Sequence, residues 1–307
     1  MNTVIITATE APIPLLYRVG LAIIKAIQTK ETESLTALMH GITHLGDGYV
    51  YLAVIMLLFW CIDEKRGLHL GIVILFSAWT NAFCKVLCMQ PRPYQLDPSV
   101  GRAFESTYGL PSGHAQLAAT FGLSLALWLR RRFIWLGAVL MILLISLSRL
   151  YLGLHFPTDL LAGWVIAGCI FTLDLRFARR ISALLRTSLR AQVLAVAVIA
   201  LTMNALYPAD KRLSAVFFGF GTGYALMLKH IHFCAGSKKR FLPRCLRALI
   251  GLSGAALLFA GLAPLLPAAS SSYYELSNFL HYALLGLWVT AGAPFLFMRL
   301  NLAEAEV

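Results

Sequence analysis

Three short islands between Lys85 and Asp159 hold the residues whose types and spacing could do chemistry. They read K-V-L-C-M-Q-P-R-P at 85–93, P-S-G-H at 111–114 and S-R-L-Y-L-G-L-H-F-P-T-D at 148–159. They supply cations, histidines, a serine hydroxyl and a carboxylate, and nearly everything around them is apolar. Because charged side chains are costly beside membrane segments, ionisable residues in such a setting are functional candidates by default.

Three basic residues, Lys85, Arg92 and Arg149, form what we call the cation cluster. No matching set of carboxylates accompanies them, so the cluster suits an anion with several oxygens such as phosphate, which arginine can bind through two oxygens at once. Ser112 and Gly113 open an apolar stretch, and a helix beginning there would offer free backbone N–H groups to the same anion. The alternative is that these cations only extend toward lipid headgroups.

His155 precedes Asp159 by four residues, with Pro157 between them at the first turn of an expected helix. A carboxylate one turn away fixes the imidazole tautomer and leaves the other ring nitrogen with a free lone pair. We therefore predict that His155 is the nucleophile and that His114 is the general acid and base. The alternative for each histidine is hydrogen-bonded packing. No cluster of carboxylate ligands and no pattern among the scattered cysteines indicates a metal, so no metal and no cofactor are predicted.

These islands resemble the type 2 phosphatidic acid phosphatase (PAP2) superfamily. The family pattern is K-x6-R-P, then P-S-G-H, then S-R-x5-H-x3-D, and this sequence matches it at every defined position. The resemblance covers roughly residues 45–207. It implies a six-helix core and a phosphatase, and it implies the following residue roles: catalytic His155, His114 and Asp159, and phosphate-binding Lys85, Arg92, Ser112, Gly113 and Arg149.

The composition indicates the elements that must position these residues. The chain has 307 residues, of which 59% are hydrophobic and only 13% charged, and its mean hydropathy is +0.75. A soluble domain is nearer a quarter charged, so we predict an all-α, polytopic transmembrane helix bundle. Nine apolar stretches come near the roughly 20 residues that a spanning helix needs. They lie at about 47–62, 67–88, 111–129, 133–153, 156–177, 192–208, 212–229, 246–267 and 276–298.

The predicted organisation has three parts. Residues 1–45 form N-terminal amphipathic or interfacial helices, residues 46–208 form the PAP2-type core, and residues 209–307 form a C-terminal extension of about three transmembrane helices with unknown role. Most Lys and Arg residues fall in the connections on one side of the predicted topology, which should be cytoplasmic. The motif loops then all open to the opposite face, toward the periplasm or exterior of what is predicted to be a bacterial inner membrane.

Two short segments have alternative interpretations. In the predicted helix at 14–29, Arg18 and Lys25 lie seven apart on one face, so the helix either lies in the membrane interface or packs on the bundle. His40 and His44 have the spacing of a metal-binding pair, but no third ligand is evident and polar packing is expected. The loop from Gln90 to Leu110, which carries Tyr94, Gln95, Asp97, Arg102, Glu105 and Tyr108, either caps the site or is ordinary solvated loop.

The C-terminal hundred residues are rich in small side chains, in G-F-G-T-G-Y at Gly219 to Tyr224 and in G-L-S-G-A-A at Gly251 to Ala256. Small residues permit close helix packing in lipid, so packing, dimerisation into a homo-oligomer or lining of a lipid path are the expected roles. The basic loop from Ser237 to Arg247 is expected to lie against anionic headgroups. The net charge of +12 is distributed in short clusters without a nucleic-acid motif, so no nucleic-acid partner is predicted.

The predicted function is that of an integral membrane lipid phosphatase. It would hydrolyse a terminal phosphate monoester or pyrophosphate of a lipid on the extracytoplasmic face, through a phosphohistidine and without metal. The expected partners are a phosphorylated lipid substrate and the surrounding membrane lipids. The alternatives are a lipid phosphotransferase, and a non-catalytic lipid-phosphate transporter or scramblase that uses the cation cluster only for binding.

Overall fold

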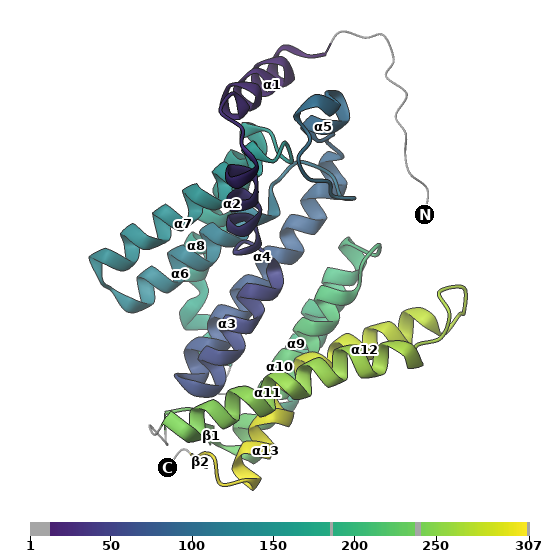
Figure 1. Cartoon of the computed structure of the whole chain (residues 1–307). Helices are drawn as coiled ribbons and strands as arrows, with labels where there is room; N and C mark the ends of the chain where they lie inside the picture. The colour runs from purple at the N-terminus through teal and green to yellow at the C-terminus, as the bar shows by residue number, and fades with distance from the viewer. Residues whose placement is uncertain (1–12, 185–186, 237–240, 306–307) are drawn as a thin grey trace. The chain divides into compact units, whose positions relative to one another are not determined.

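The computed structural model describes residues 13–184, 187–236 and 241–305, and these are mostly helical (Figure 1). Part of the predicted N-terminal segment (1–12) and part of the predicted basic loop (237–240) lie outside the described residues. The all-α prediction is confirmed for the described ranges, with one small addition. The short strands β1 (Phe233–Cys234) and β2 (Glu304–Ala305) pair in antiparallel fashion.

The chain folds into two compact units that are each discontinuous in sequence. The first unit contains the described residues up to Asp47 together with Asn81–Cys169, and the second contains Gly48–Thr80 and the chain from Ile170 onward. Two long helices, α4 (Glu64–Cys88) and α8 (Pro157–Leu184), contribute residues to both units. All the residues predicted for the site belong to the first unit.

The first unit is built from helices that start where the sequence supplies a capping residue. It contains the end of α4, the beginning of α8, and the elements α1 (Leu15–Gln28), α2 (Glu33–His44), α5 (Pro93–Leu96), η1 (Pro98–Val100), α6 (Gly113–Leu129) and α7 (Arg132–Tyr151). Thr32 caps α2 by accepting a hydrogen bond from the backbone of Leu35, and Ser112 caps α6 in the same way through Ala115. Pro157 is the first residue of α8, as expected.

Small residues let the helices of this unit approach closely. A Cβ atom on Gly163 of α8 would lie 2.8 Å from the carbonyl oxygen of Ser112, and one on Gly122 of α6 would lie 3.2 Å from the Cβ of Ala138 on α7. The beginning of α8 is therefore packed directly against the beginning of α6. This contact holds the second and third sequence islands side by side.

The helix α1 packs on the first unit through one face. Gly20, Leu21 and Ile24 are buried, and Leu21 and Ile24 belong to a cluster with Val100 and Phe156. Several apolar residues on its other faces are exposed, among them Leu15, Leu16, Val19 and Ile23. Packing on the bundle, one of the two alternatives for this segment, is thus what the structure shows. A position of its exposed face in the membrane interface stays a prediction.

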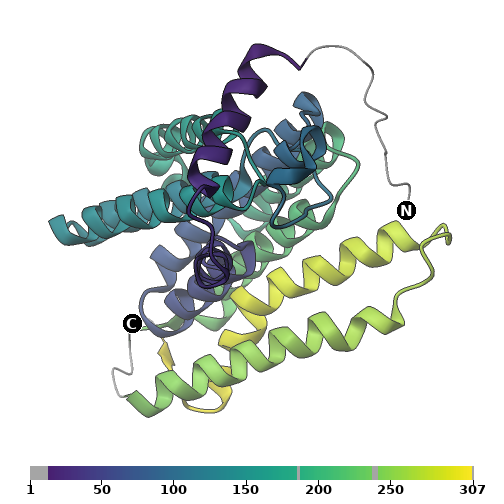
Figure 2. The ribbon, with the colours of Figure 1, turned by 45° about the horizontal axis from the view of Figure 1, so that its top comes forward.

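The second unit is a helical bundle in which α11 and α12 run side by side (Figure 1 and Figure 2). Its elements, besides parts of α4 and α8, are α3 (Gly48–Cys61), α9 (Leu189–Leu206), α10 (Arg212–Leu226), η2 (Met227–Ile231), β1, α11 (Phe241–Leu262), η3 (Ala263–Leu265), α12 (Tyr274–Leu287), η4 (Trp288–Gly292), α13 (Ala293–Arg299) and β2. A Cβ on Gly219 would lie 1.8 Å from the Ala283 carbonyl oxygen, and one on Gly251 would lie 2.4 Å from the Trp60 ring. This is the close packing that the small residues predict.

Six helical segments in the described ranges are long and apolar enough to cross a membrane, or up to seven if a bent pair counts as one span. Nine spans were expected. The remaining three predicted stretches correspond to α3, α6 and α10, which have 14, 17 and 15 residues and are not among these six; η2 follows α10 without a break. Hydropathy alone places the apolar stretches but not the ends of the helices. The protein is an integral, multi-pass membrane protein.

Candidate active site

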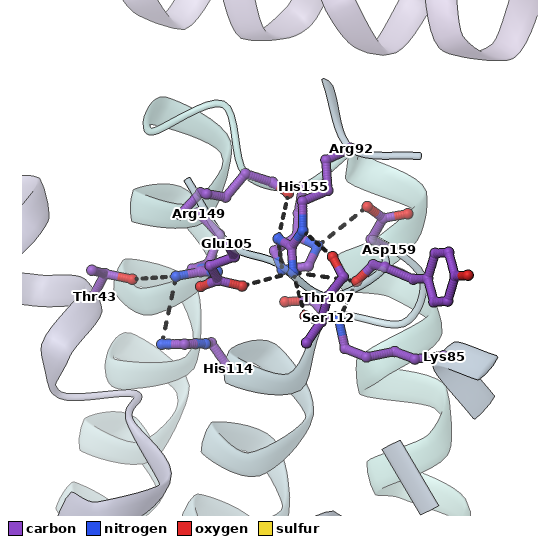
Figure 3. A network of polar contacts seen from close by, with 12 residues as sticks. Thr43, Lys85, Arg92, Glu105, Thr107, Ser112, His114, Arg149, His155 and Asp159 are labelled. Atoms are coloured by element: carbon purple, nitrogen blue, oxygen red, sulfur yellow. Dashed lines mark hydrogen bonds and ion pairs between the residues drawn. The ribbon is translucent and has the colours of Figure 1, made fainter. Parts of the chain in front are cut away.

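The three sequence islands meet in the first unit, where their polar side chains form one network (Figure 3). Each predicted residue lies at or near the end of a helix. Lys85 is in the last turn of α4, Arg92 caps α5, Ser112 caps α6, and Arg149 is in the last turn of α7. The remaining residues stand at the beginning of α6 (Gly113, His114), before α8 (His155) and in the first turn of α8 (Asp159).

His155 and Asp159 form a buried pair. Oδ2 of Asp159 lies 3.3 Å from Nδ1 of His155 and also accepts a hydrogen bond of 2.9 Å from the backbone N–H of Phe156. His155 and Asp159 are only 1% and 2% exposed. With a proton on Nδ1 facing the carboxylate, the lone pair of the ring is on Nε2.

Arg92 fixes the other side of the His155 ring. Its guanidinium is fully buried, and Nη1 lies 3.3 Å from Nε2 of His155 while donating a hydrogen bond of 2.9 Å to the carbonyl of Leu154. Nε and Nη2 donate to the backbone and hydroxyl oxygens of Thr107 at 2.6 and 2.9 Å. The guanidinium is thus held on several sides, and its Nη1 points at the free nitrogen of His155.

Arg149 links the two histidine regions of the network. Its Nη1 donates a 3.0 Å hydrogen bond to the hydroxyl of Thr43 on α2, and the same atom lies 3.5 Å from Nε2 of His114. Its Nη2 contacts the carboxylate of Glu105. The guanidinium is buried, as is that of Arg92. Two arginines therefore lie between the predicted nucleophile and the predicted acid.

Glu105 bridges the two arginines (Figure 3). Its Oε2 lies 2.7 Å from Nη2 of Arg92, and its Oε1 pairs with Nη2 of Arg149. Burial raises the pKa of this carboxyl, but the positive charges of Arg149 and Arg92 outweigh burial and lower its pKa to about 2. Glu105 is therefore ionised, and its two oxygens stand where two oxygens of a bound oxyanion would meet the same guanidinium groups.

Lys85, Ser112 and Gly113 complete the surroundings. The ammonium of Lys85 donates to the carbonyl of Tyr108. Ser112 is fully buried and its backbone N–H donates to the carbonyl of Asp159 at 2.9 Å, which ties the start of α6 to α8. A Cβ on Gly113 would lie 3.0 Å from Oδ1 of Asn81, so this position favours glycine.

The charges around His155 set its protonation state. Burial lowers the pKa of His155 well below its ordinary value, and the nearby positive charges of Arg92, Arg149 and Lys85 lower it further. The imidazole is therefore neutral at neutral pH. A neutral ring with Nδ1–H against a carboxylate keeps its lone pair on Nε2, on the side of the ring that faces Arg92.

The 90–110 loop is held in place by the N-terminal helices and by the site. Lys25 of α1 lies 2.7 Å from Asp97, Arg102 pairs with Glu31, and the side chain of Gln28 donates to the carbonyl of Val100 at 2.9 Å. At the loop's other end Glu105 enters the network. Of the two alternatives for this loop, the structure favours the one in which it covers the site.

Several residues of the network were not predicted as site residues. Thr43, Asp47 and Thr107 were not singled out, and Glu105 was named only as a member of the loop. His44, considered with His40 as a metal pair, instead lies with Nδ1 2.8 Å from Oδ2 of Asp47. Within the described residues no group of three His, Cys, Asp or Glu side chains is arranged to hold a metal ion.

Comparison with known proteins places the chain in a family. Residues 66–182 match the model of the PAP2 superfamily, and residues 212–305 match the model described as PAP2 superfamily phosphatase, transmembrane extension. An undecaprenyl-diphosphatase from Sulfolobus acidocaldarius is 29% identical over 160 residues, covering 50% of this chain and 75% of the relative. The crystal structure of the first transmembrane PAP2 type phosphatidylglycerolphosphate phosphatase from Bacillus subtilis covers 53% of this chain and 86% of that chain, with 29% identity and a TM-score of 0.46.

This chain matches a further relative over most of that relative's length. Phosphatidylglycerophosphatase B from Bacillus subtilis is 30% identical over 173 residues, which is 52% of this chain and 83% of the relative. The match to the PAP2 superfamily model, at residues 66–182, includes the stretch that carries all three islands. The chain belongs to the PAP2 superfamily.

Proposed function

We propose that this protein is a membrane phosphatase that removes a terminal phosphate from a lipid through a phosphohistidine on His155. One observation carries the proposal. The buried imidazole of His155 is oriented by the carboxylate of Asp159, and its Nε2 lies 3.3 Å from the guanidinium of Arg92. Arg92 and Arg149 share one anionic partner, the carboxylate of Glu105. A nucleophile beside a preformed oxyanion position is what phosphoryl transfer requires.

The reaction proceeds in two displacements. In the first, Nε2 of His155 attacks phosphorus, the bond from phosphorus to the lipid oxygen breaks, and His114 gives its proton to the leaving oxygen. In the second, water attacks phosphorus, the P–N bond to His155 breaks, and the proton of the water passes to His114. Inorganic phosphate leaves, and both histidines return to their starting states.

The cation cluster supplies the electrostatic part of the mechanism. The phosphoryl group replaces the carboxylate of Glu105 between Arg92 and Arg149, and Lys85 adds a third positive charge at the edge of the site. Charge that develops on the equatorial oxygens is thereby stabilised by groups already held in place by protein hydrogen bonds. These cations do the charge work that metal ions do in other phosphoryl-transfer sites, so no metal is required.

The substrate is a lipid because of where the site lies. The helices that carry it belong to a multi-pass membrane protein, and an amphiphile reaches such a site from the bilayer. Relatives named for undecaprenyl diphosphate, phosphatidylglycerophosphate, sphingosine-1-phosphate and lipid A share this family. Their common feature is a terminal phosphate on a lipid anchor, and that is the substrate class proposed here. The distribution of Lys and Arg supports a site on the extracytoplasmic face, which is part of the proposal.

Phosphate release from a panel of lipid phosphates tests the proposal. Protein purified in detergent with EDTA is assayed against phosphatidate, phosphatidylglycerophosphate, polyprenyl diphosphate, a sphingoid-base phosphate and a lipid A phosphate. The wild type should turn over at least one of them, and His155→Gln and His114→Gln should lose that turnover. His230→Gln changes an exposed histidine of the second unit and serves as the matched control.

The alternatives give different results in the same assay. A transporter or scramblase releases no phosphate and keeps its transport in His155→Gln. A phosphotransferase gives little free phosphate in detergent but transfers the label when an acceptor lipid or sugar is added. Turnover that depends on a metal, or an unchanged His155→Gln variant, would overturn the mechanism.

A further inference from the structure

A short turn after α2 brings the N-terminal segment against His114. The backbone N–H groups of Gly46 and Asp47 donate to the carbonyls of Thr43 and His44 at 2.9 and 3.2 Å, so the turn is tightly wound. A Cβ on Gly46 would lie 2.7 Å from Cδ2 of His114. The turn is thus in contact with the imidazole ring, and a larger residue at position 46 would have to displace one of them.

Asp47 sits at the centre of a chain of hydrogen bonds. Its Oδ1 lies 2.9 Å from Nε2 of His114, and its Oδ2 lies 2.8 Å from Nδ1 of His44. The side chains of His114 and Asp47 are 18% and 20% exposed, whereas that of His44 is 65% exposed. The chain therefore leads from the site to the surface in two steps.

The charged groups facing His114 come from every element around it. Arg149 of α7 brings a positive charge, Glu105 of the covering loop a negative one, and Asp47, with its partner His44, a second negative one. A general acid must carry a proton before it can give one away. A mostly buried imidazole beside a guanidinium resists protonation, and the only negative group hydrogen-bonded directly to its Nε2 among the described residues is Asp47.

We propose that Asp47 is a positioning residue that keeps a proton on Nε2 of His114, and that His44 steadies Asp47 from the solvent side. This inference rests on the proposed function and deepens it. The same nitrogen lies 3.5 Å from Nη1 of Arg149, so the stored proton is on the side of the ring that faces the cation cluster. The site then has two histidine–carboxylate pairs, one for the nucleophile and one for the acid.

The proton balance follows from this arrangement. Between turnovers the proton on Nε2 is shared with Oδ1 of Asp47. When the bond from phosphorus to the lipid oxygen breaks, that oxygen replaces Asp47 as the partner of Nε2 and takes the proton. In the second displacement the attacking water returns a proton to Nε2, and the hydrogen bond to Asp47 forms again. No proton is gained or lost by the chain over one cycle.

This role predicts a dependence on the leaving group. An alkoxide is a poor leaving group and needs the proton, whereas a nitrophenolate leaves without one. General acid catalysis contributes roughly 10²–10⁴-fold. A loss of Asp47 that impairs only the acid therefore lowers kcat/KM for an alkyl phosphate and largely spares an aryl phosphate. The ratio kcat/KM is the right quantity because it reports the steps up to the first displacement only.

The experiment compares Asp47→Asn with wild type on two substrates. The alkyl substrate is the lipid phosphate that the panel shows to be turned over fastest, and the aryl substrate is p-nitrophenyl phosphate. We expect kcat/KM for the lipid to fall at least about tenfold, kcat/KM for the aryl phosphate to fall less than about threefold, and the alkaline limb of the lipid profile to move to lower pH. His44→Ala should show the same pattern at roughly threefold, the effect of one exposed hydrogen bond.

Controls separate this role from a structural one. Glu33→Gln removes one negative charge from an exposed position on α2, the helix that carries His44. It should leave kcat/KM for both substrates and the pH profile unchanged. Since His44 is mostly exposed, His44→Ala keeps the test open even if Asp47→Asn folds poorly. Equal losses on both substrates, or an alkaline limb that stays in place, overturn the inference but leave the phosphatase intact. A wild type that releases phosphate from neither substrate overturns the proposed function as well.

Discussion

Glu105→Gln should make the protein bind oxyanions more tightly. In the structure the carboxylate of Glu105 bridges Arg92 and Arg149, so an incoming phosphate must first displace it. A hydrogen bond to a charged group contributes roughly 1.5–3 kcal/mol. The amide keeps the shape and one acceptor oxygen, and Glu105 is 31% exposed. We therefore expect that removing the Glu105 carboxylate as a competitor for the two arginines makes oxyanion binding more favourable by about 1.4 kcal/mol, which is tenfold in a dissociation constant.

The assay is the inhibition constant for orthovanadate, an analogue of five-coordinate phosphorus, measured with the lipid substrate in detergent. Glu105→Gln should lower that constant roughly tenfold. It should also unfold at a lower temperature without ligand, because two buried guanidinium groups lose their counter-charge, and inorganic phosphate should restore more stability to it than to wild type. Asp97→Asn is the matched control, since Asp97 lies in the same loop but pairs with Lys25. An inhibition constant that stays the same or rises in Glu105→Gln refutes the idea that this carboxylate occupies the oxyanion position.

Two further predictions concern stability. The pKa of His155 is lowered in the folded protein, so below the ordinary imidazole pKa of about 6.5 only the unfolded chain takes up the proton. The contribution of His155 to the free energy of unfolding is therefore fully present above that pH and is lost as the pH falls. The free energy of unfolding of wild type should therefore fall relative to His155→Gln by about 1.4 kcal/mol per pH unit below that point, and parallel curves would contradict the assignment. Gly163→Ala should destabilise the protein by about 1–3 kcal/mol, because the new Cβ meets the Ser112 carbonyl oxygen at 2.8 Å. Gly168→Ala on the same helix meets nothing within 4 Å and should unfold at the wild-type temperature.

Local patterns were enough to predict the backbone of the site. The four-residue spacing of His155 and Asp159, the helix start at Pro157 and the cap at Ser112 all follow from short-range rules and all appear in the structure. The apolar stretches predicted the helices, and six of the nine predicted stretches correspond to helical segments long and apolar enough to cross a membrane. Helix ends depend on caps and turns, which hydropathy does not register.

The carboxylates that complete the network could not be predicted from local patterns. Asp47 meets a residue 67 positions away, and Glu105 meets one 44 positions away. Both sit in connections without periodicity, where sequence gives no direction for a side chain. The only available signal was charge balance: a cluster of three cations, two of which are buried arginines, implies that some acidic side chain lies near it when no phosphate is bound. The long loop between the first two islands holds two acidic residues, Asp97 and Glu105, and charge balance alone does not choose between them.

The most direct test of the central claim is to trap the phosphorylated enzyme. Wild type is mixed with a ³²P-labelled lipid phosphate, quenched in alkali, where phosphohistidine survives, and digested for mass spectrometry. We expect a phosphoryl group on the peptide that contains His155, located on that imidazole, and its absence in His155→Gln. Label on a different residue, or full turnover with no labelled protein at any quench time, would contradict it.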